Sequence, residues 1–162
     1  MYGCTNNSKE GMDMIVNTRL FGEMDVQDDK IINIDKGIIG FPDMKLFTLV
    51  FDSEKDSKNI MWLQSLDETA FAMPVMVPNN VVEDYNPTIE DELLKPLGEL
   101  NPDNTYVLVT VKVPSNIEDM TINLKAPIII NTDTLIGGQI IVEDDVEVRF
   151  PIYDLLKKGA GK

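Results

Sequence analysis

The sequence predicts an all-β domain that contains one short helix. Short apolar segments rich in Val, Ile, Phe and Tyr recur between turn-forming Gly, Pro and Asn residues, a spacing typical of all-β proteins. Only one internal segment, near residue 90, carries the pattern of a short helix. The chain has 162 residues, of which 43% are hydrophobic. This is enough to bury the core of one domain of ordinary size.

The expected strands start at Met14 and continue to residue 150. They cover residues 14–21, 31–34, 47–51, 60–66, 72–77, 106–112, 121–130 and 139–142, with 146–150 as a final candidate. Residues 106–111 form an almost unbroken apolar run, which indicates a central strand covered on both faces. Residues 131–134 predict a connection between two antiparallel strands, with Gly137 and Gly138 giving backbone freedom at the return.

The short helix is expected to begin at Ile89. Thr88 can cap the first free backbone amides, and the acidic residues that follow place negative charge at the positive end of the helix dipole. Pro96 or Gly98 ends the helix. A second helical turn is expected at residues 153–158.

One domain is expected over residues 14–158. Met14 could be an alternative start, so residues 1–13 are expected to be a flexible extension or an appended remnant. They have neither the basic start nor the apolar stretch of a signal peptide. Residues 159–162 are expected to fray. Cys4 is the single cysteine, so no disulfide can form within the chain. Together these features predict an intracellular protein, and no apolar run reaches the roughly 20 residues of a bilayer span.

The chain is strongly acidic. It carries 14 Lys and Arg against 28 Asp and Glu, which gives a formal net charge of −14. Such a surface repels phosphate, so direct binding of nucleic acid or an anionic membrane is not expected. A basic protein partner is the natural complement, although acidity that serves only solubility is an equal alternative.

Catalysis has little support in the sequence. There is no histidine, the commonest general base near neutral pH and the commonest nitrogen ligand of metals. Cys4 lies in a polar segment with no evident base to activate it. The cluster of Glu143, Asp144, Asp145 and Glu147 lacks the spacing of an EF-hand loop, so a turn that faces water or a basic partner is favoured over a calcium site. We therefore expect no enzyme activity, cofactor or metal.

Three segments, taken together and in order, resemble one protein family. They are Gly-Ile-Ile-Gly-Phe-Pro at 37–42, Trp-Leu-Gln-Ser-Leu-Asp at 62–67 with Ala-Met-Pro-Val at 72–75, and Asn-Leu-Lys-Ala-Pro-Ile-Ile-Ile-Asn at 123–131. They resemble the FliW family of flagellar assembly factors from about residue 14 to residue 152. The segment 123–131 is the most specific of the three.

The resemblance implies a fold and a function. The family fold resembles a small antiparallel β-barrel, in agreement with the expected strands. FliW-like proteins are non-enzymatic cytoplasmic regulators that bind flagellin and also CsrA, an RNA-binding repressor of flagellin translation. Export of flagellin frees the factor to antagonise the repressor, so that two partners compete for one protein by mass action. The alternative function is a β-barrel protein that binds ligands or acts on carbohydrates through paired carboxylates.

Candidate protein-binding residues come from two places. Strand alternation in 123–131 predicts one core-facing set at even positions and one outward set at odd positions. The acidic residues near the expected helix form the second group. The candidates are Glu83, Asp84, Glu90, Asp91, Glu92, Asn123, Lys125, Ile129 and Asn131. For an apolar contact with flagellin, the hypothetical anchors are Trp62, Phe71, Met73 and Met76, for which a place in the core is the favoured alternative.

Overall fold

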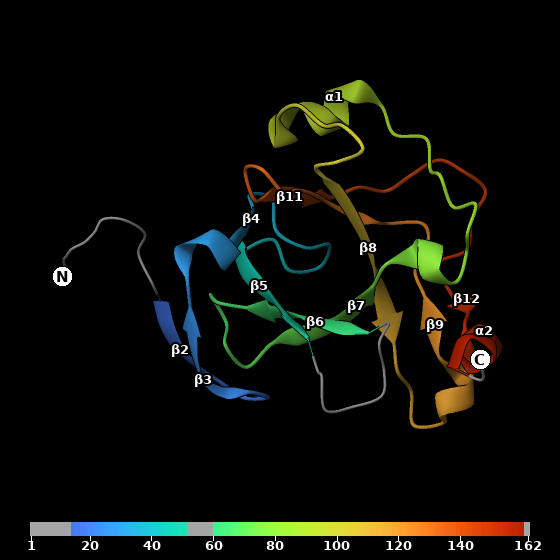
Figure 1. Ribbon diagram of the computed structural model, residues 1–162, viewed down its shortest axis with the longest axis horizontal. Helices are drawn as coiled ribbons and strands as arrows, with labels where there is room; N and C mark the ends of the chain where they lie inside the picture. The colour runs from blue at the N-terminus through green and yellow to red at the C-terminus, as the bar shows by residue number, and fades with distance from the viewer. Residues whose placement is uncertain (1–13, 52–59, 161–162) are drawn as a thin grey trace.

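The computed structural model describes residues 14–51 and 60–160. Seven strands form a closed β-barrel, in which each strand pairs with the next and the last pairs with the first (Figure 1). In spatial order they are β10 (Ile128–Asn131), β11 (Ile136–Gln139), β4 (Ile32–Ile34), β5 (Leu46–Phe51), β6 (Met61–Ser65), β7 (Ala72–Met76) and β8 (Thr105–Lys112). The predicted all-β, barrel-like class is confirmed. All pairs are antiparallel except β11 with β4, which is parallel.

Smaller elements surround the barrel. The strands β9 (Thr121–Ile122) and β12 (Phe150–Pro151) continue the sheet outward from β8, and β2 (Met14–Thr18) pairs with β3 (Gly22–Val26) as a separate hairpin. Two α-helices, α1 (Asp91–Leu94) and α2 (Tyr153–Ala160), lie at different ends of the molecule (Figure 1). Four 3-10 turns complete it: η1 (Asp28–Lys30), η2 (Pro78–Asn80), η3 (Lys95–Leu97) and η4 (Ile117–Asp119).

Two apolar cores lie on opposite sides of β8. Leu108 faces the barrel interior and packs with Phe47, Leu63 and seven other buried residues, five of which are isoleucines. Val109 and Val111 face the other way and pack with Ile152 in a second core under β9 and β12. Alternate side chains of one strand point to opposite faces of the sheet, so both faces of β8 are buried. This confirms the prediction of a central strand covered on both faces.

The N-terminal strand is shorter than predicted. Instead of one strand over 14–21, the chain turns after Thr18 and returns as β3, which the sequence reading missed. The Thr18 hydroxyl donates to Gly22 O at 2.9 Å and accepts from Phe21 N–H at 3.0 Å, while Gly22 has φ +67°. A side-chain hydrogen bond and a glycine with positive φ together stabilise this tight return.

The predicted strand over 121–130 is also wrong, because the chain bends at residues 123–127 between β9 and β10. Pro127 has no N–H to donate to a strand ladder. Similarly, the strands expected at 139–142 and 146–150 are replaced by β11 and β12. The antiparallel connection after Asn131 is confirmed, with Leu135 rather than a glycine at positive φ, +59°. Gly137 lies within β11, where a Cβ would stand 3.0 Å from Ile129 O.

The short helix begins later than predicted. Its N-cap is Glu90, whose side chain makes no capping hydrogen bond, and Thr88 N–H instead donates to Asp144 Oδ1 at 3.0 Å. The helix continues directly into η3 and ends at Gly98, which has φ +88°. The predicted helical turn at 153–158 is part of α2. The expected extension at 1–13 and the last residues, 161–162, lie outside the described part of the chain.

Candidate protein-binding surfaces

The segment 37–42 forms a tight loop between β4 and β5. Gly37 has φ +71°, and a Cβ there would stand 2.5 Å from Phe41 O. Backbone hydrogen bonds join Ile38 and Phe41 in both directions, at 3.2 and 2.6 Å. Ile38 is 3% exposed and belongs to the barrel core. The loop therefore puts one isoleucine into the barrel and leaves its other apolar side chains outside.

The segment 62–67 fixes the turn between β6 and β7. Gln64 is fully buried, and its amide nitrogen donates to the backbone oxygens of Ser65, Thr69 and Phe71 at 2.8 to 3.1 Å. The Ser65 hydroxyl accepts from Glu68 N–H at 2.9 Å. These polar side chains satisfy backbone groups of a turn that has few ladder partners of its own.

The bend at 123–127 is held by polar contacts to two distant loops. Asn123 Oδ1 accepts from Lys125 N–H at 2.9 Å, which makes a local side-chain turn. Lys125 Nζ donates to Asp144 O at 2.6 Å. The Tyr85 hydroxyl donates to Leu124 O at 2.6 Å. Desolvation by burial, with a smaller contribution from the Asp144 carboxylate, raises the pKa of Tyr85 from 10.0 to about 12.

Asn131 is a buried structural residue. Its amide nitrogen donates to Leu97 O at 2.8 Å and to Glu99 O at 3.2 Å, and its oxygen accepts from Asp133 N–H at 2.9 Å. It thereby ties the end of η3 to the hairpin between β10 and β11. Only 1% of the residue is exposed. The prediction that Asn131 faces outward is wrong.

Ile129 does not face solvent either. It is 3% exposed and packs with Leu97 and Ile140 in a small core beneath α1 and η3. Strand alternation did not predict this burial, because the segment that contains η3 covers the outer face of the barrel at this point. Asn123 and Lys125 are partly exposed. Their binding roles stay predictions, and their observed contacts are structural.

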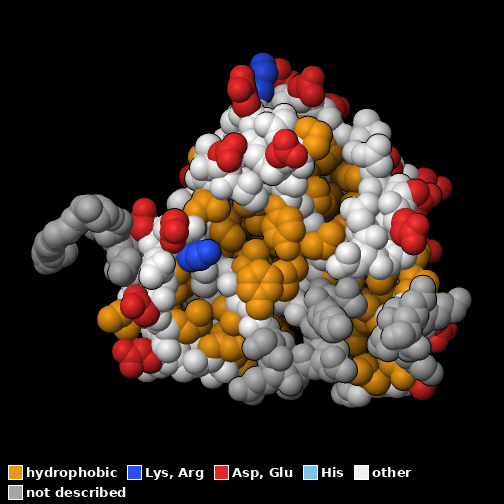
Figure 2. Space-filling model, viewed as in Figure 1, with side chains coloured by type: hydrophobic (Ala, Val, Ile, Leu, Met, Phe, Trp, Pro, Cys, Tyr) orange, Lys and Arg blue, Asp and Glu red, His pale blue; other side chains and the backbone are white. Residues whose placement is uncertain are grey.

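The predicted acidic residues lie on the surface and gain neighbours from a second loop. Thr88 N–H bonds to Asp144, so the segment of residues 83–92 lies against that of residues 143–147. We define the acidic surface as the exposed acidic side chains of these two segments: Glu83, Asp84, Glu90, Asp91, Glu92, Glu143, Asp145 and Glu147. Figure 2 shows acidic side chains at the top of the molecule and along both its right-hand and left-hand margins. The structure thus combines the two acidic clusters of the sequence.

Few Lys or Arg side chains pair with the carboxylates of the acidic surface. Among the described residues, one of these carboxylates forms an ion pair: Lys95 Nζ lies 2.9 Å from Glu92 Oε1, and both side chains are more than 70% exposed. An exposed pair of this kind contributes little to stability. Nor do His, Cys, Asp and Glu residues of the described chain form a group of three suited to a metal ion. The surface presents mostly uncompensated negative charge.

A second, apolar surface lies at one end of the barrel. Ile39 is 51% and Phe41 40% exposed, and the ring of Phe41 lies 4.8 Å from that of Phe71. We call these three residues the barrel-end patch. Figure 2 shows hydrophobic side chains near the centre of the face, where the segment between β4 and β5 runs in Figure 1. Exposed apolar groups that adjoin one another are a common feature of protein-binding sites.

The hypothetical apolar anchors are divided by the structure. Phe71 is half-buried and belongs to the barrel-end patch, whereas Met76 is fully buried in the second core. Trp62 and Met73 are half-buried, and Trp62 makes an edge contact with Phe21 at 6.2 Å. Ile39 and Phe41 were not predicted to lie on the surface. The sequence pattern that could have indicated it is a glycine-rich turn with a large apolar residue on each side of Gly40.

Fold and surface together define a class: a small, closed β-barrel whose loops are locked by polar side chains and whose exterior exposes acidic and apolar groups. The FliW protein family model matches residues 15–152. The flagellar assembly factor FliW of Lachnospira eligens is 53% identical over 148 residues, which cover 90% of this chain and 98% of that protein. That of Lachnoclostridium phytofermentans is 44% identical and covers 92% and 97%, respectively.

The chain belongs to the FliW family of flagellar assembly factors. The resemblance carried by the three sequence segments is therefore confirmed. The fold agrees with a crystal structure of the flagellar assembly factor FliW at a TM-score of 0.78 and 23% identity, over 86% of this chain and 97% of that one. Among the described residues, no helix has the length and apolar character needed to cross a membrane.

Proposed function

We propose that this chain is a non-enzymatic cytoplasmic regulator that binds flagellin and antagonises the RNA-binding repressor CsrA by exchange of partners. Membership of the FliW family is the observation that carries the proposal. In this scheme flagellin and CsrA each lower the affinity of the protein for the other. Export of flagellin then raises the concentration of free factor and draws CsrA away from RNA by mass action.

The acidic surface supports the CsrA arm of the proposal. A protein that grips RNA must expose basic residues, and a net charge of −14 steers such a partner toward this chain. Because few Lys or Arg side chains of the described residues pair with the carboxylates of the acidic surface, these carboxylates are available to a cationic partner. Once bound, they lower the positive potential that RNA requires. The antagonism is then partly electrostatic.

The barrel-end patch supports the flagellin arm. Amphipathic helical segments are commonly bound through apolar anchors, and aromatic side chains are favoured at the centres of interfaces. Ile39, Phe41 and Phe71 offer such anchors at a distance in sequence from the acidic residues. The patch also includes two residues of the family segment 37–42. Flagellin is therefore the partner that we assign to it.

Co-elution on size exclusion tests the proposal as a whole. The full chain is mixed at micromolar concentration with its cognate CsrA and, separately, with cognate flagellin. A complex is expected in each case. In a third mixture that contains both partners, the amount of each binary complex is expected to be lower than in the mixture with that partner alone. The absence of a complex with both partners would remove the proposal.

Charge reversal tests the acidic surface. Glu90→Lys with Glu92→Lys is expected to weaken CsrA binding at least tenfold in calorimetry at low salt, and the effect should shrink as salt rises. Glu23→Lys with Asp25→Lys on β3 is the matched control, because it makes the same change of charge at exposed positions of the separate hairpin. Equal losses in the two variants would mean that only net charge matters and that the site is misplaced.

Polar substitution tests the barrel-end patch. Phe41→Ser is expected to weaken flagellin binding by more than about tenfold, as for a central interface anchor, and to leave CsrA affinity within about twofold. Ile15→Ser is the control, since Ile15 is 67% exposed on β2. Unfolding curves show whether each variant is folded at the assay temperature. Normal flagellin affinity of folded Phe41→Ser would exclude the patch.

The alternative of a carbohydrate-active barrel has less support. That function needs paired carboxylates in a pocket. One polar cavity among the described residues, beside β8 and β9, is lined by no carboxylate. Binding of neutral oligosaccharides by the full chain, measured by calorimetry, would revive the alternative.

A further inference from the structure

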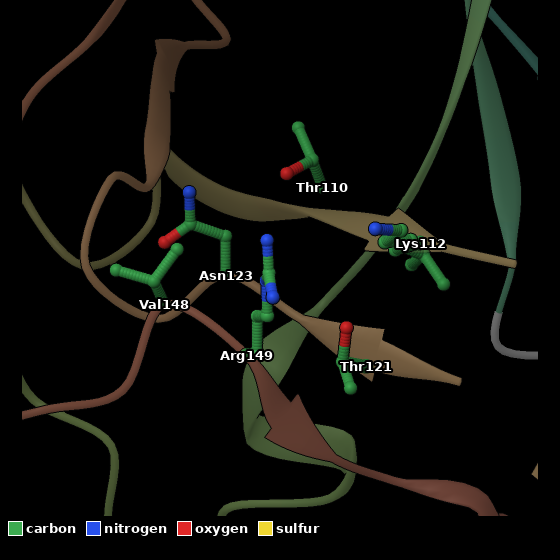
Figure 3. A pocket seen from close by; sticks show the side chains of 7 residues that line it. Thr110, Lys112, Thr121, Asn123, Val148 and Arg149 are labelled. Atoms are coloured by element: carbon green, nitrogen blue, oxygen red, sulfur yellow. The ribbon is translucent and has the colours of Figure 1, made fainter. Parts of the chain in front are cut away.

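A small cavity lies where β8, β9 and the residues just before β12 meet, on the face of this part of the sheet that is turned away from the second core (Figure 3). Its volume is about 200 Å³. A water molecule in the liquid occupies about 30 Å³, so the cavity can hold a small ion with part of its hydration shell. Its walls are Thr110, Val111, Lys112, Thr121, Asn123, Val148 and Arg149.

The strand register brings the polar members of this set together. Lys112 is paired with Thr121, and Asn123 N–H bonds to Thr110 O, so the two strands present these residues side by side. Phe150 is paired with Ile122, which places Arg149 opposite Asn123. Residues two apart on a strand share a face. Figure 3 shows the resulting group of side chains over neighbouring strands.

The cavity is a local exception to the charge of the protein. Two of its walls are cationic and none is acidic, although the whole chain has 28 acidic and 14 basic residues. Within the part of the chain that the structure describes, Lys112 and Arg149 make no ion pair. Cations that served only to balance the acidic surface would be expected beside carboxylates. Their convergence on a carboxylate-free cavity instead suits an anion from outside.

The neutral residues add hydrogen-bond donors. The side chains of Thr110 and Thr121 carry hydroxyl groups. The oxygen of Asn123 is occupied by Lys125 N–H at 2.9 Å, whereas its amide nitrogen has no hydrogen bond to another described residue. Guanidinium, ammonium, hydroxyl and amide groups are the donors that bind phosphate and carboxylate oxygens.

We propose that this cavity is an oxyanion-binding site, which takes a phosphate or a carboxylate group between Arg149 and Lys112 with Asn123 and the threonine hydroxyls as further donors. The inference is independent of the proposed function, because none of the lining residues belongs to the acidic surface or to the barrel-end patch. Arg149 supplies a planar pair of donors and Lys112 a point charge.

Titration of the isotope-labelled full chain tests the site by NMR. Inorganic phosphate and acetate are added separately at constant ionic strength, with sodium chloride as the balancing salt, because screening alone affects so acidic a protein. At least one oxyanion is expected to give saturable amide shifts that are concentrated at residues 110–112, 121–123 and 148–149. The stronger probe identifies the preferred oxyanion. Shifts that do not saturate, or that spread evenly over the chain, with both probes would overturn the proposal.

Matched variants separate the site from general charge. Lys112→Gln with Arg149→Gln is expected to weaken the saturable binding at least tenfold, and Arg149→Lys alone should weaken it less. Lys30→Gln with Lys36→Gln makes the same change of net charge at exposed positions elsewhere and should leave binding within about twofold. The dispersion of the amide spectrum shows that each variant is folded. Unchanged binding in the Lys112 and Arg149 double variant would refute the site, as would an equal loss in the control.

Discussion

The family segments and the acidic surface differ in how firmly they are tied to the rest of the molecule. In segments 37–42, 62–67 and 123–131, side chains donate to backbone groups of other turns, and Gly37 has no room for a Cβ. The acidic surface, by contrast, has one exposed ion pair among the described contacts. Residues that identify a family can therefore serve its fold, while partner binding can use side chains that make few contacts within the protein itself.

This division explains the polar residues of segment 123–131. Asn123 forms a turn, Lys125 holds the loop at Asp144, and Asn131 joins η3 to the hairpin. Each side chain makes hydrogen bonds to backbone groups of its own turn or of a distant segment. Substitutions in the family segments should therefore lower stability more than substitutions at the acidic surface.

The largest loss of stability is expected for Gly37→Ala. A Cβ would lie 2.5 to 2.6 Å from backbone atoms of Phe41 and Pro42, and φ is +71°. Steric clash with backbone and left-handed strain together should lower the free energy of unfolding by about 4 kcal/mol. Gly40→Ala is the control, because its φ is +91° but no atom lies within 4 Å of its Cβ. Urea unfolding measures both, and equal losses would show that the close approach is unimportant.

Asn131→Ala should come next. The change removes four hydrogen bonds made by a side chain whose residue is only 1% exposed. The carbonyl oxygen of Leu97 then loses the amide group that donates to it. We expect the free energy of unfolding to fall by roughly 3 kcal/mol. Asn33→Ala, at an exposed position of β4, should cost less than about 0.5 kcal/mol in the same urea experiment. A small loss for Asn131→Ala would break the structural interpretation of the segment.

A smaller effect is expected for Tyr85→Phe. The change removes the hydroxyl that donates to Leu124 O at 2.6 Å and keeps the buried ring. The free energy of unfolding should fall by about 1.5 kcal/mol at pH 8, the usual size for a lost buried hydrogen bond. Tyr106→Phe provides the comparison and should cost less, because the hydroxyl of this half-buried tyrosine donates only to the sulfur of Met61, at 3.5 Å. An unchanged urea midpoint for Tyr85→Phe would contradict a role of this bond.

Tyr85 also predicts a dependence on alkaline pH. Burial, with a smaller contribution from Asp144, raises its pKa to about 12 in the folded protein, against 10.0 for an ordinary tyrosine. Above pH 10 the unfolded chain ionises first, so the stabilisation is complete below pH 10 and declines as pH rises toward 12. The difference in unfolding free energy between the natural chain and Tyr85→Phe should therefore narrow from pH 9 to pH 11.5. A constant difference would show that the tyrosine ionises equally in both states.

The smallest effect on stability is expected at the acidic surface. Lys95→Met breaks the ion pair with Glu92, whose side chain is 77% exposed. The free energy of unfolding should change by less than about 0.5 kcal/mol, because solvent screens both charges. The comparison would fail if this variant were destabilised as much as Asn131→Ala. Thermal unfolding at low and moderate salt provides the measurement.

Local sequence patterns predicted the parts of the fold that depend on nearby residues. The apolar run at 106–111 indicated a strand with two covered faces, and β8 has a core on each side. The turn after Asn131 was also predicted. The start of α1 and the existence of β3 were not predicted, since capping and tight turns depend on single hydrogen bonds such as those of Thr18 and Thr88.

The family, the all-β class and the excess of negative charge follow from residue type and order alone. Which residues of 123–131 are exposed depends instead on contacts that exist only in the folded protein. Ile129 and Asn131 are covered by η3, which lies about thirty residues earlier in the chain. Folding also brings the acidic segments 83–92 and 143–147 together and places Lys112 and Arg149 in the wall of one cavity. Burial and proximity arise from contacts between distant segments, which no local periodicity specifies.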